Sequence, residues 1–166
     1  MDSIIARIAV ILVGLLALAG AAAGVNMLMQ SNTASRVDTD VASILNQARG
    51  AFASGPTGYT NFTTANLAQL VNAGVFPSDM VVGSAVNDPW GNSVTLSSAN
   101  GGTQGVLTFG GGGSETVATC SKAATGIKDY VALKIGTTAF TPSAPPDAVT
   151  AATACSTGMT LVLTFQ

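Results

Sequence analysis

Residues Ile4 to Met29 form a long apolar run, which reads IIARIAVILVGLLALAGAAAGVNMLM. Only Arg7 and Asn26 interrupt this apolar series. A helix rises about 1.5 Å per residue, so a helix of this length more than spans a bilayer core of roughly 30 Å. A secretory signal peptide is also apolar, but this run is too long, lacks a basic start and has no small-x-small cleavage site. We therefore expect a helix covered by lipid or by copies of itself.

The helical pattern continues beyond this run. Apolar residues recur three and four positions apart and predict one buried face: Val37, Val41, Ile44, Leu45, Ala48 and Phe52. No proline precedes Pro56, so one helix is expected from about Ser3 to about Ala53. We divide the chain into a transmembrane or filament-core helix over residues 1–29, its amphipathic continuation over residues 30–54, and a globular head over residues 55–166.

The head alternates short elements with turns. Thr64 is expected to cap a helix that carries Leu67, Leu70 and Val71 and ends at Gly74. A second helix is expected from Asp147 to Ala154, entered through Pro145 and Pro146. Five apolar runs predict strands: Met80 to Val82, Val94 to Leu96, Val106 to Phe109, Tyr130 to Ile135 and Met159 to Phe165. The predicted fold class is α+β, with a long N-terminal helix packed on an antiparallel β-sheet.

Composition argues against several classes of function. Charged residues make up 8% of the chain and the net charge is −2, so nucleic-acid binding gains no electrostatic support. The chain has no histidine, and thus lacks the usual general base and the commonest metal ligand. We expect neither an enzyme nor a bound cofactor.

Two glycine- or carboxylate-rich motifs admit a functional and a structural interpretation. Asp79, Asp88 and Asn92 offer too few oxygens for calcium, so we favour a tight turn with Trp90 packed on the core. Gly110 to Gly113 lacks the Lys-Ser/Thr that follows a phosphate-binding loop, so it is interpreted as a surface turn.

The cysteines Cys120 and Cys155 both lie in the part expected beyond the membrane. An even number of cysteines in an exported domain favours one disulfide, which would close off the region between them. Two buried free thiols are the alternative, because unpaired cysteine is often buried.

An anchor helix that continues into a small α+β head with a C-terminal cysteine loop resembles the type IV pilins. The segment Leu67-Ala-Gln-Leu-Val-Asn-Ala-Gly-Val-Phe-Pro-Ser-Asp-Met80 and the turn Asn87-Asp-Pro-Trp-Gly-Asn92 resemble the type IVb pilins of conjugative thin pili, the PilS-like subfamily. The resemblance implies a major structural subunit that polymerises through its helix into an extracellular filament. The alternatives are a type II secretion pseudopilin and a minor or adhesive pilin.

The resemblance also implies partners and locations. They are other copies of the chain, the prepilin peptidase, the pilus assembly machinery, and the inner membrane with the head in the periplasm before assembly. The chain has Ile5 where the family carries a glutamate. The sequence opens at Met1 without the family's short leader, so we favour Met1 as the processed first residue, with a true initiator as the alternative. Asp2 and Arg7 are expected to pair between neighbouring subunits, or else to mark the cytoplasmic edge of the anchor. Gly14, Gly20 and Gly24 give a small-residue face that allows close helix packing.

Overall fold

The computed structural model describes residues 32–166. The expected anchor, residues 1–29, lies outside the described residues, and so do the assembly residues Met1, Asp2, Ile5, Arg7, Gly14, Gly20 and Gly24. Within residues 32–166, no helix has both the length and the apolar character that a membrane crossing requires. Residues 33–166 form one compact unit, which therefore includes most of the helix of residues 32–52 together with the predicted globular part. We call this whole unit the head.

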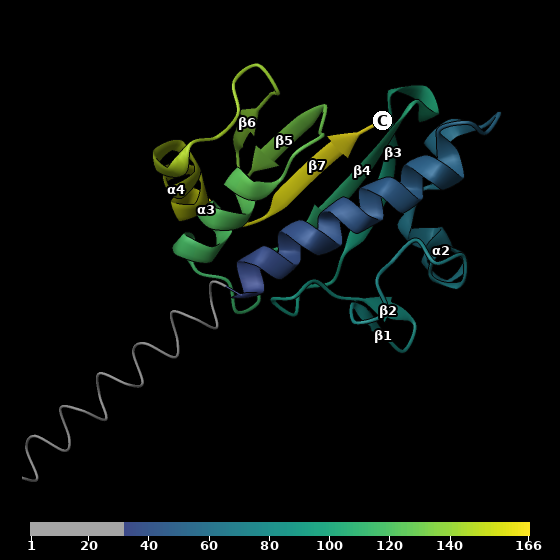
Figure 1. Ribbon diagram of the computed structural model, residues 1–166, viewed down its shortest axis with the longest axis horizontal. Helices are drawn as coiled ribbons and strands as arrows, with labels where there is room; N and C mark the ends of the chain where they lie inside the picture. The colour runs from purple at the N-terminus through teal and green to yellow at the C-terminus, as the bar shows by residue number, and fades with distance from the viewer. Residues whose placement is uncertain (1–31) are drawn as a thin grey trace, which may run out of the picture. The chain divides into compact units, whose positions relative to one another are not determined.

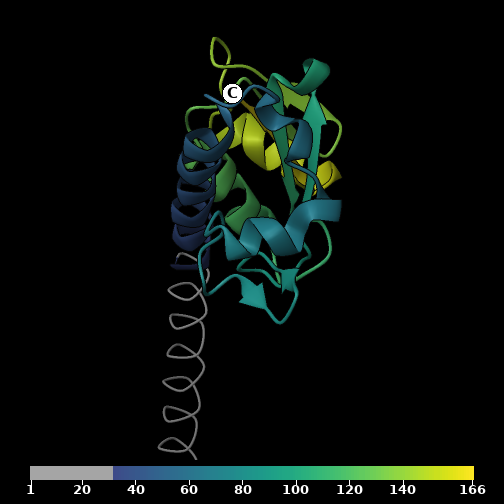
Figure 2. The same ribbon diagram turned by 90° about the vertical axis from the view of Figure 1, so that its right-hand side faces the viewer.

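The described chain begins in a helix that covers residues 32–52. Its predicted apolar face is buried, with Val37, Val41, Ile44, Leu45 and Ala48 each no more than 5% exposed. This helix lies across the sheet in Figure 1 and along one side of the head in Figure 2. The amphipathic spacing therefore predicts the buried face correctly, because one face of the helix packs on the head and the other remains in solvent.

The main sheet has five antiparallel strands in the order β3-β4-β7-β5-β6. The last strand of the chain, β7, therefore lies at the centre of the sheet, between β4 and β5. The strand bounds are β3 Thr95–Ala99, β4 Gln104–Phe109, β5 Ala132–Ile135, β6 Thr138–Phe140 and β7 Leu161–Phe165.

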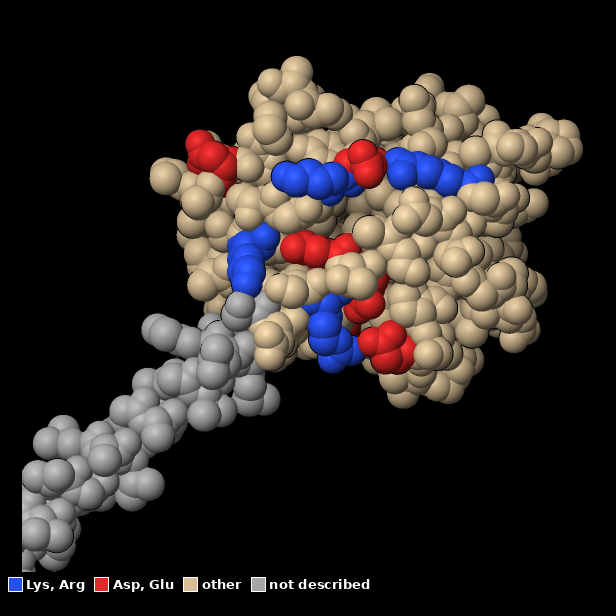
Figure 3. Space-filling view, viewed as in Figure 1, with Lys and Arg blue, Asp and Glu red and all other residues tan. Residues whose placement is uncertain are grey.

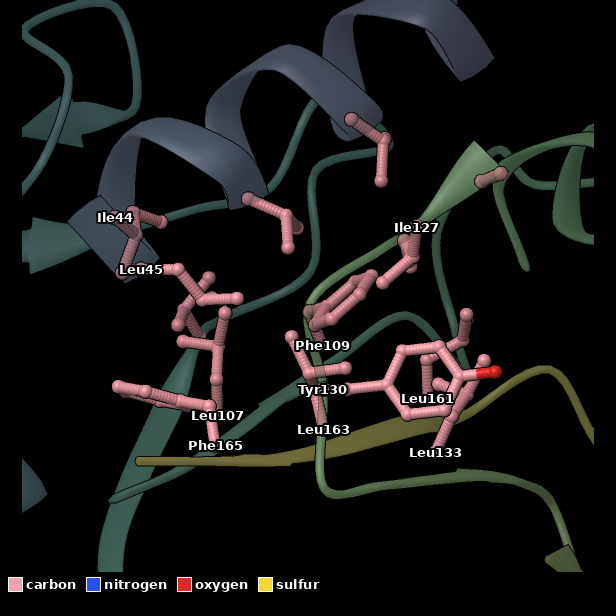
Figure 4. Close-up of a cluster of buried hydrophobic side chains, with 14 of the residues drawn as sticks. Ile44, Leu45, Leu107, Phe109, Ile127, Tyr130, Leu133, Leu161, Leu163 and Phe165 are labelled. Atoms are coloured by element: carbon pink, nitrogen blue, oxygen red, sulfur yellow. The ribbon is translucent and has the colours of Figure 1, made fainter. Parts of the chain in front are cut away.

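The strand register places one row of large apolar residues across all five strands. Leu107 pairs with both Leu96 and Leu163, and Leu133 pairs with both Leu163 and Phe140. All five side chains are buried on the face that meets the helix, and Figure 4 shows several of them gathered below Ile44 and Leu45. Alternation in β7 explains this arrangement, because successive strand residues point to opposite faces.

The remaining elements surround the sheet. Their bounds are η1 Gly58–Asn61, η2 Thr64–Asn66, α2 Leu67–Asn72, β1 Val81–Val82, β2 Ala85–Val86, η3 Asn100–Gly102, α3 Val117–Gly126 and α4 Ala148–Thr157. Strands β1 and β2 form a separate two-stranded hairpin.

One predicted contact is wrong. Thr64 does not cap α2, because its hydroxyl donates to the Leu96 carbonyl at 3.0 Å and accepts from the Leu96 amide at 2.7 Å. A short 3-10 helix, η2, precedes α2 instead, and its N-cap residue makes no side-chain capping bond. The predicted helix end is confirmed, since Gly74 follows α2 with a φ of +73°.

Candidate functional site

The region between the two cysteines forms one side of the head. Cys120 in α3 and Cys155 in α4 are joined by a disulfide, with a Cα–Cα distance of 6.1 Å. The predicted bridge is thus present, and free thiols are excluded for this pair. Both sulfurs belong to fully buried residues between the two helices. The bridge therefore holds α3 and α4 together while β5 and β6 extend the sheet between them.

Both helices of this region begin with a capping box. The Thr116 hydroxyl accepts from the Thr119 amide, and the Thr119 hydroxyl accepts from the Thr116 amide. In α4, the Asp147 side chain accepts from the amides of Val149 and Thr150, and the Thr150 hydroxyl accepts from the Asp147 amide. These hydrogen bonds lower the pKa of Asp147. The first backbone amides of a helix have no partner within the helix, and the capping box supplies partners for them in both helices. The N-termini of α3 and α4 are therefore fixed independently of the disulfide.

Arg49 connects the helix of residues 32–52 to two distant segments. Its Nε donates to the Gln166 carbonyl at 2.8 Å, and one Nη donates to the Asp129 carbonyl at 2.5 Å. Bonds from a guanidinium are stronger than neutral ones. Arg49 therefore ties the helix to the end of β7 and to the loop that follows α3.

Asp38 lies on the same helix, against the last turn of α3. Its Oδ1 is buried without a hydrogen-bond partner, and a Cβ added at Gly126 would overlap its carboxylate. Burial raises the pKa of Asp38 to about 6, although the charges of Lys122 and Lys128 oppose the shift. This carboxyl group is therefore packed at a place that disfavours its charge.

Asp40 lies two residues on, beside the loop that leads into β1. It is 8% exposed, and its Oδ2 is buried without a partner. Burial and the nearby charge of Asp79 raise its pKa, while Arg36 opposes them. Arg36 pairs instead with Asp79 at 2.7 Å, in an ion pair whose side chains are both about half exposed. This flank of the helix thus carries two carboxylates and one guanidinium.

The turn around Trp90 is held by carboxylate groups that bind backbone amides. Asp88 accepts from the amides of Trp90, Asn92 and Gly110 at 2.7 to 2.9 Å. Glu115 accepts from the amides of Gly111 and Gly112 and from the Asn92 side chain. Burial would raise the pKa of Glu115, but these hydrogen bonds lower it overall.

The same contacts engage the carboxylates that were weighed as calcium ligands at this turn. Asp79 forms an ion pair with Arg36, and both Asp88 oxygens already accept hydrogen bonds. Within residues 32–166, no group of three acidic, histidine or cysteine side chains could hold a metal ion. Trp90 is 4% exposed and stacks on Phe109, which confirms the interpretation as a tight turn covering the core.

Charge is unevenly spread over the head. Figure 3 shows acidic and basic side chains side by side across the middle of the visible face, while most of that face is uncharged. The helix of residues 32–52 carries four of the charged residues of the described chain, Arg36, Asp38, Asp40 and Arg49. Neighbouring charges of opposite sign suit contacts between proteins.

An α+β head with a helix laid on a central antiparallel sheet and a disulfide-bounded C-terminal region is the architecture of a type IV pilin. A family model described as PilS N terminal matches residues 31–166. The chain therefore belongs to the PilS family of type IV pilins. Its assembled form is an extracellular pilus, and the family is one of structural subunits.

Comparison with solved structures finds similarity to TcpA, a type IV pilin from Vibrio cholerae El Tor biotype. The identity is 16% and the TM-score is 0.48, with 83% of this chain and 99% of that chain covered. No curated protein matches the sequence.

Several residues of the site were not predicted. Arg49 donates to backbone carbonyls far away in the sequence. Glu115 accepts from backbone amides only three and four residues before it, but neither residue belongs to a recognisable local motif. Helix α3 was missed as well. Its cap signal, Thr116-x-x-Thr119, could have been found, because a threonine can replace the usual Glu or Gln of the capping box.

Proposed function

We propose that the chain is the major structural subunit of a type IVb pilus, conjugative or adhesive, and that residues 1–29 polymerise into the core of the filament. The observation that carries this proposal is a combination within one chain. A PilS-family head over residues 31–166 follows an apolar run, Ile4 to Met29, that is too extensive to remain in water.

In this proposal the subunit occupies two environments in turn. Before assembly the apolar helix is anchored in the inner membrane, with the head in the periplasm, and the prepilin peptidase and the assembly machinery act on it there. After assembly the same helix is buried among copies of itself in the extracellular filament. Both environments remove the apolar surface from water, so one segment serves both.

Three features of residues 1–29 would then direct assembly. Gly14, Gly20 and Gly24 allow neighbouring helices to approach closely. Asp2 and Arg7 are costly in an apolar core unless paired. An axial offset of about 7.5 Å, five residues of helix rise, would bring Asp2 of one subunit to Arg7 of the next. This pair would replace the family's glutamate at the position of Ile5, with Met1 supplying the terminal amine.

Deleting residues 1–29 tests the proposal. We expect the remaining head to be soluble and monomeric by sedimentation and to build no filaments, because the unpartnered apolar surface lies ahead of it. The full chain, expressed with the assembly machinery, serves as the control and should give surface filaments. Filaments built from the truncated head would show that residues 1–29 are not the polymerising element.

A further inference from the structure

Two carboxyl groups of the helix of residues 32–52 are buried without the partners that a charged group needs. Asp38 Oδ1 and Asp40 Oδ2 are both inaccessible to solvent, and neither accepts a hydrogen bond within the described head. A buried carboxylate oxygen without a partner disfavours the charged form of the group. Residues two positions apart lie about 200° apart around a helix, so the two groups face different flanks.

The flank of Asp38 is the contact with the last turn of α3. Its carboxyl group packs on Gly126, the final residue of α3, so closely that no Cβ would fit there. The C-terminal end of a helix carries partial negative charge, which further disfavours a carboxylate at this place. A cavity of about 120 Å³ lies beside the group, between the two elements, and leaves room for movement. The charged groups around Asp38 are Lys122, Lys128, Asp129 and Arg49.

The flank of Asp40 is the contact with the segment of residues 79–89. Asp40 and Asp88 line a space of about 10 Å³ whose other walls include Met80 and Pro89. Asp88 already accepts backbone amides with both of its oxygens, so it offers Asp40 no cation and no donor. The other charged groups around Asp40 are Asp79, which raises its pKa, and Arg36, which opposes the shift.

Ionisation has the same consequence at both flanks. Each carboxyl group is favoured in its neutral form while it is packed, and in its ionised form once the contact opens to water. The packed form of Asp38 has a pKa of about 6, against an ordinary value of 3.8. The packed contact therefore binds more protons than the open one between these values, and opening becomes more favourable as pH rises through them.

We propose that two acid-tightened contacts hold this helix on the head, Asp38 against the end of α3 and Asp40 against residues 79–89, and that each loosens independently as pH rises. In Figure 1, α3 and the β1–β2 hairpin lie on opposite sides of the helix, so each contact involves a different part of the head. The inference goes beyond the proposed function, because both contacts lie within one head and do not require assembly.

Amide hydrogen exchange measured by NMR on the detergent-solubilised full chain tests the proposal. The Ile127 amide, which donates to the Ala123 carbonyl at 3.0 Å, reports on the flank of Asp38. The Asn87 amide, which donates to the Met80 carbonyl at 2.9 Å, reports on the flank of Asp40. After correction for the intrinsic pH dependence of exchange, protection of Ile127 should fall about tenfold from pH 5 to pH 7.5, as linkage to the Asp38 pKa requires. Protection of Asn87 should fall in the same direction.

Three variants assign the effect to its residues. Asp38→Asn should abolish the pH dependence at Ile127 and leave that at Asn87 unchanged, whereas Asp40→Asn should do the reverse. Asp129→Asn is the matched control, because it removes an exposed carboxylate from the cavity beside Asp38 and should leave both reporters as they were. The proposal is overturned if both reporters keep their pH dependence in both variants, or if either variant changes the two reporters equally, as global unfolding would. It is also overturned if the control abolishes the pH dependence at Ile127.

Discussion

Asp38 shows how a single carboxyl group can make the head sensitive to pH. Its pKa is raised to about 6 by burial against the last turn of α3. In the unfolded chain the ordinary value, near 3.8, applies. Between these two values the folded head binds more protons than the unfolded chain, so the contribution of Asp38 to stability falls as pH rises through the window.

We predict that Asp38→Asn stabilises the chain at pH 7.5 and has little effect at pH 4. The asparagine keeps the shape of the side chain and removes a charge that burial disfavours. Because Asp38 is only partly buried, the gain is discounted to about 1 kcal/mol. Thermal unfolding of the detergent-solubilised full chain at several pH values measures it.

Asp129→Asn is the matched control for this prediction. It removes the same charge close to Lys128, but from an exposed residue. Its φ of +59° is one that asparagine tolerates, so the backbone is not strained. Asp38 would have no such role if both variants gave the same pH dependence, or if Asp38→Asn stabilised the chain more at pH 4 than at pH 7.5.

At the scale of elements, the sequence predicts those that carry a strong period or a clear turn. Alternation from Met159 to Phe165 predicts β7 with its buried face, and Asp147 behind two prolines predicts α4. Helix α3 was missed because Val117–Gly126 contains mostly alanine, threonine and glycine, so its apolar period is weak. Strand β6 was missed because three residues, of which only Phe140 is buried, give no period to detect.

Contacts between elements were harder to predict than the elements. Thr64 looks like a cap in the sequence, but its hydroxyl pairs with Leu96 because the chain folds back there. Arg49 donates hydrogen bonds to Asp129 and Gln166, which lie 80 and 117 positions further along the chain. Such bonds depend on the tertiary arrangement of the sheet, which no local pattern contains.

The disulfide gives a prediction about helices α3 and α4. Cys120 and Cys155 are 35 residues apart, and a closed loop of that length is worth about 4 kcal/mol in the chain-entropy model. We predict that the double variant Cys120→Ala, Cys155→Ala lowers the free energy of unfolding by up to that amount. Denaturant titration of the detergent-solubilised chain measures the loss.

Reduction of the unmodified chain is the control, and it should lower stability by a similar amount. The capping boxes at Thr116 and Asp147 remain in the variant, so α3 and α4 are expected to persist as helices while their packing loosens. Unchanged stability in both the variant and the reduced chain would show that the bridge does not hold this region.

Two parts of the whole chain differ in what buries their apolar residues. The head folds around its own core, in which the row from Leu96 to Phe140 meets the helix of residues 32–52. The apolar run from Ile4 to Met29 finds no comparable partner in the sequence of one chain. Its burial requires lipid or other copies, and in the proposed function a polymer supplies those copies.

Helical reconstruction of purified filaments by electron cryomicroscopy would show whether residues 1–29 form the filament core. We predict long uniform filaments in which this chain is the repeating subunit, with residues 1–29 packed together along the axis and the heads outside. Filaments built mainly of another protein, or filaments of this chain whose axis is not formed by residues 1–29, would contradict it.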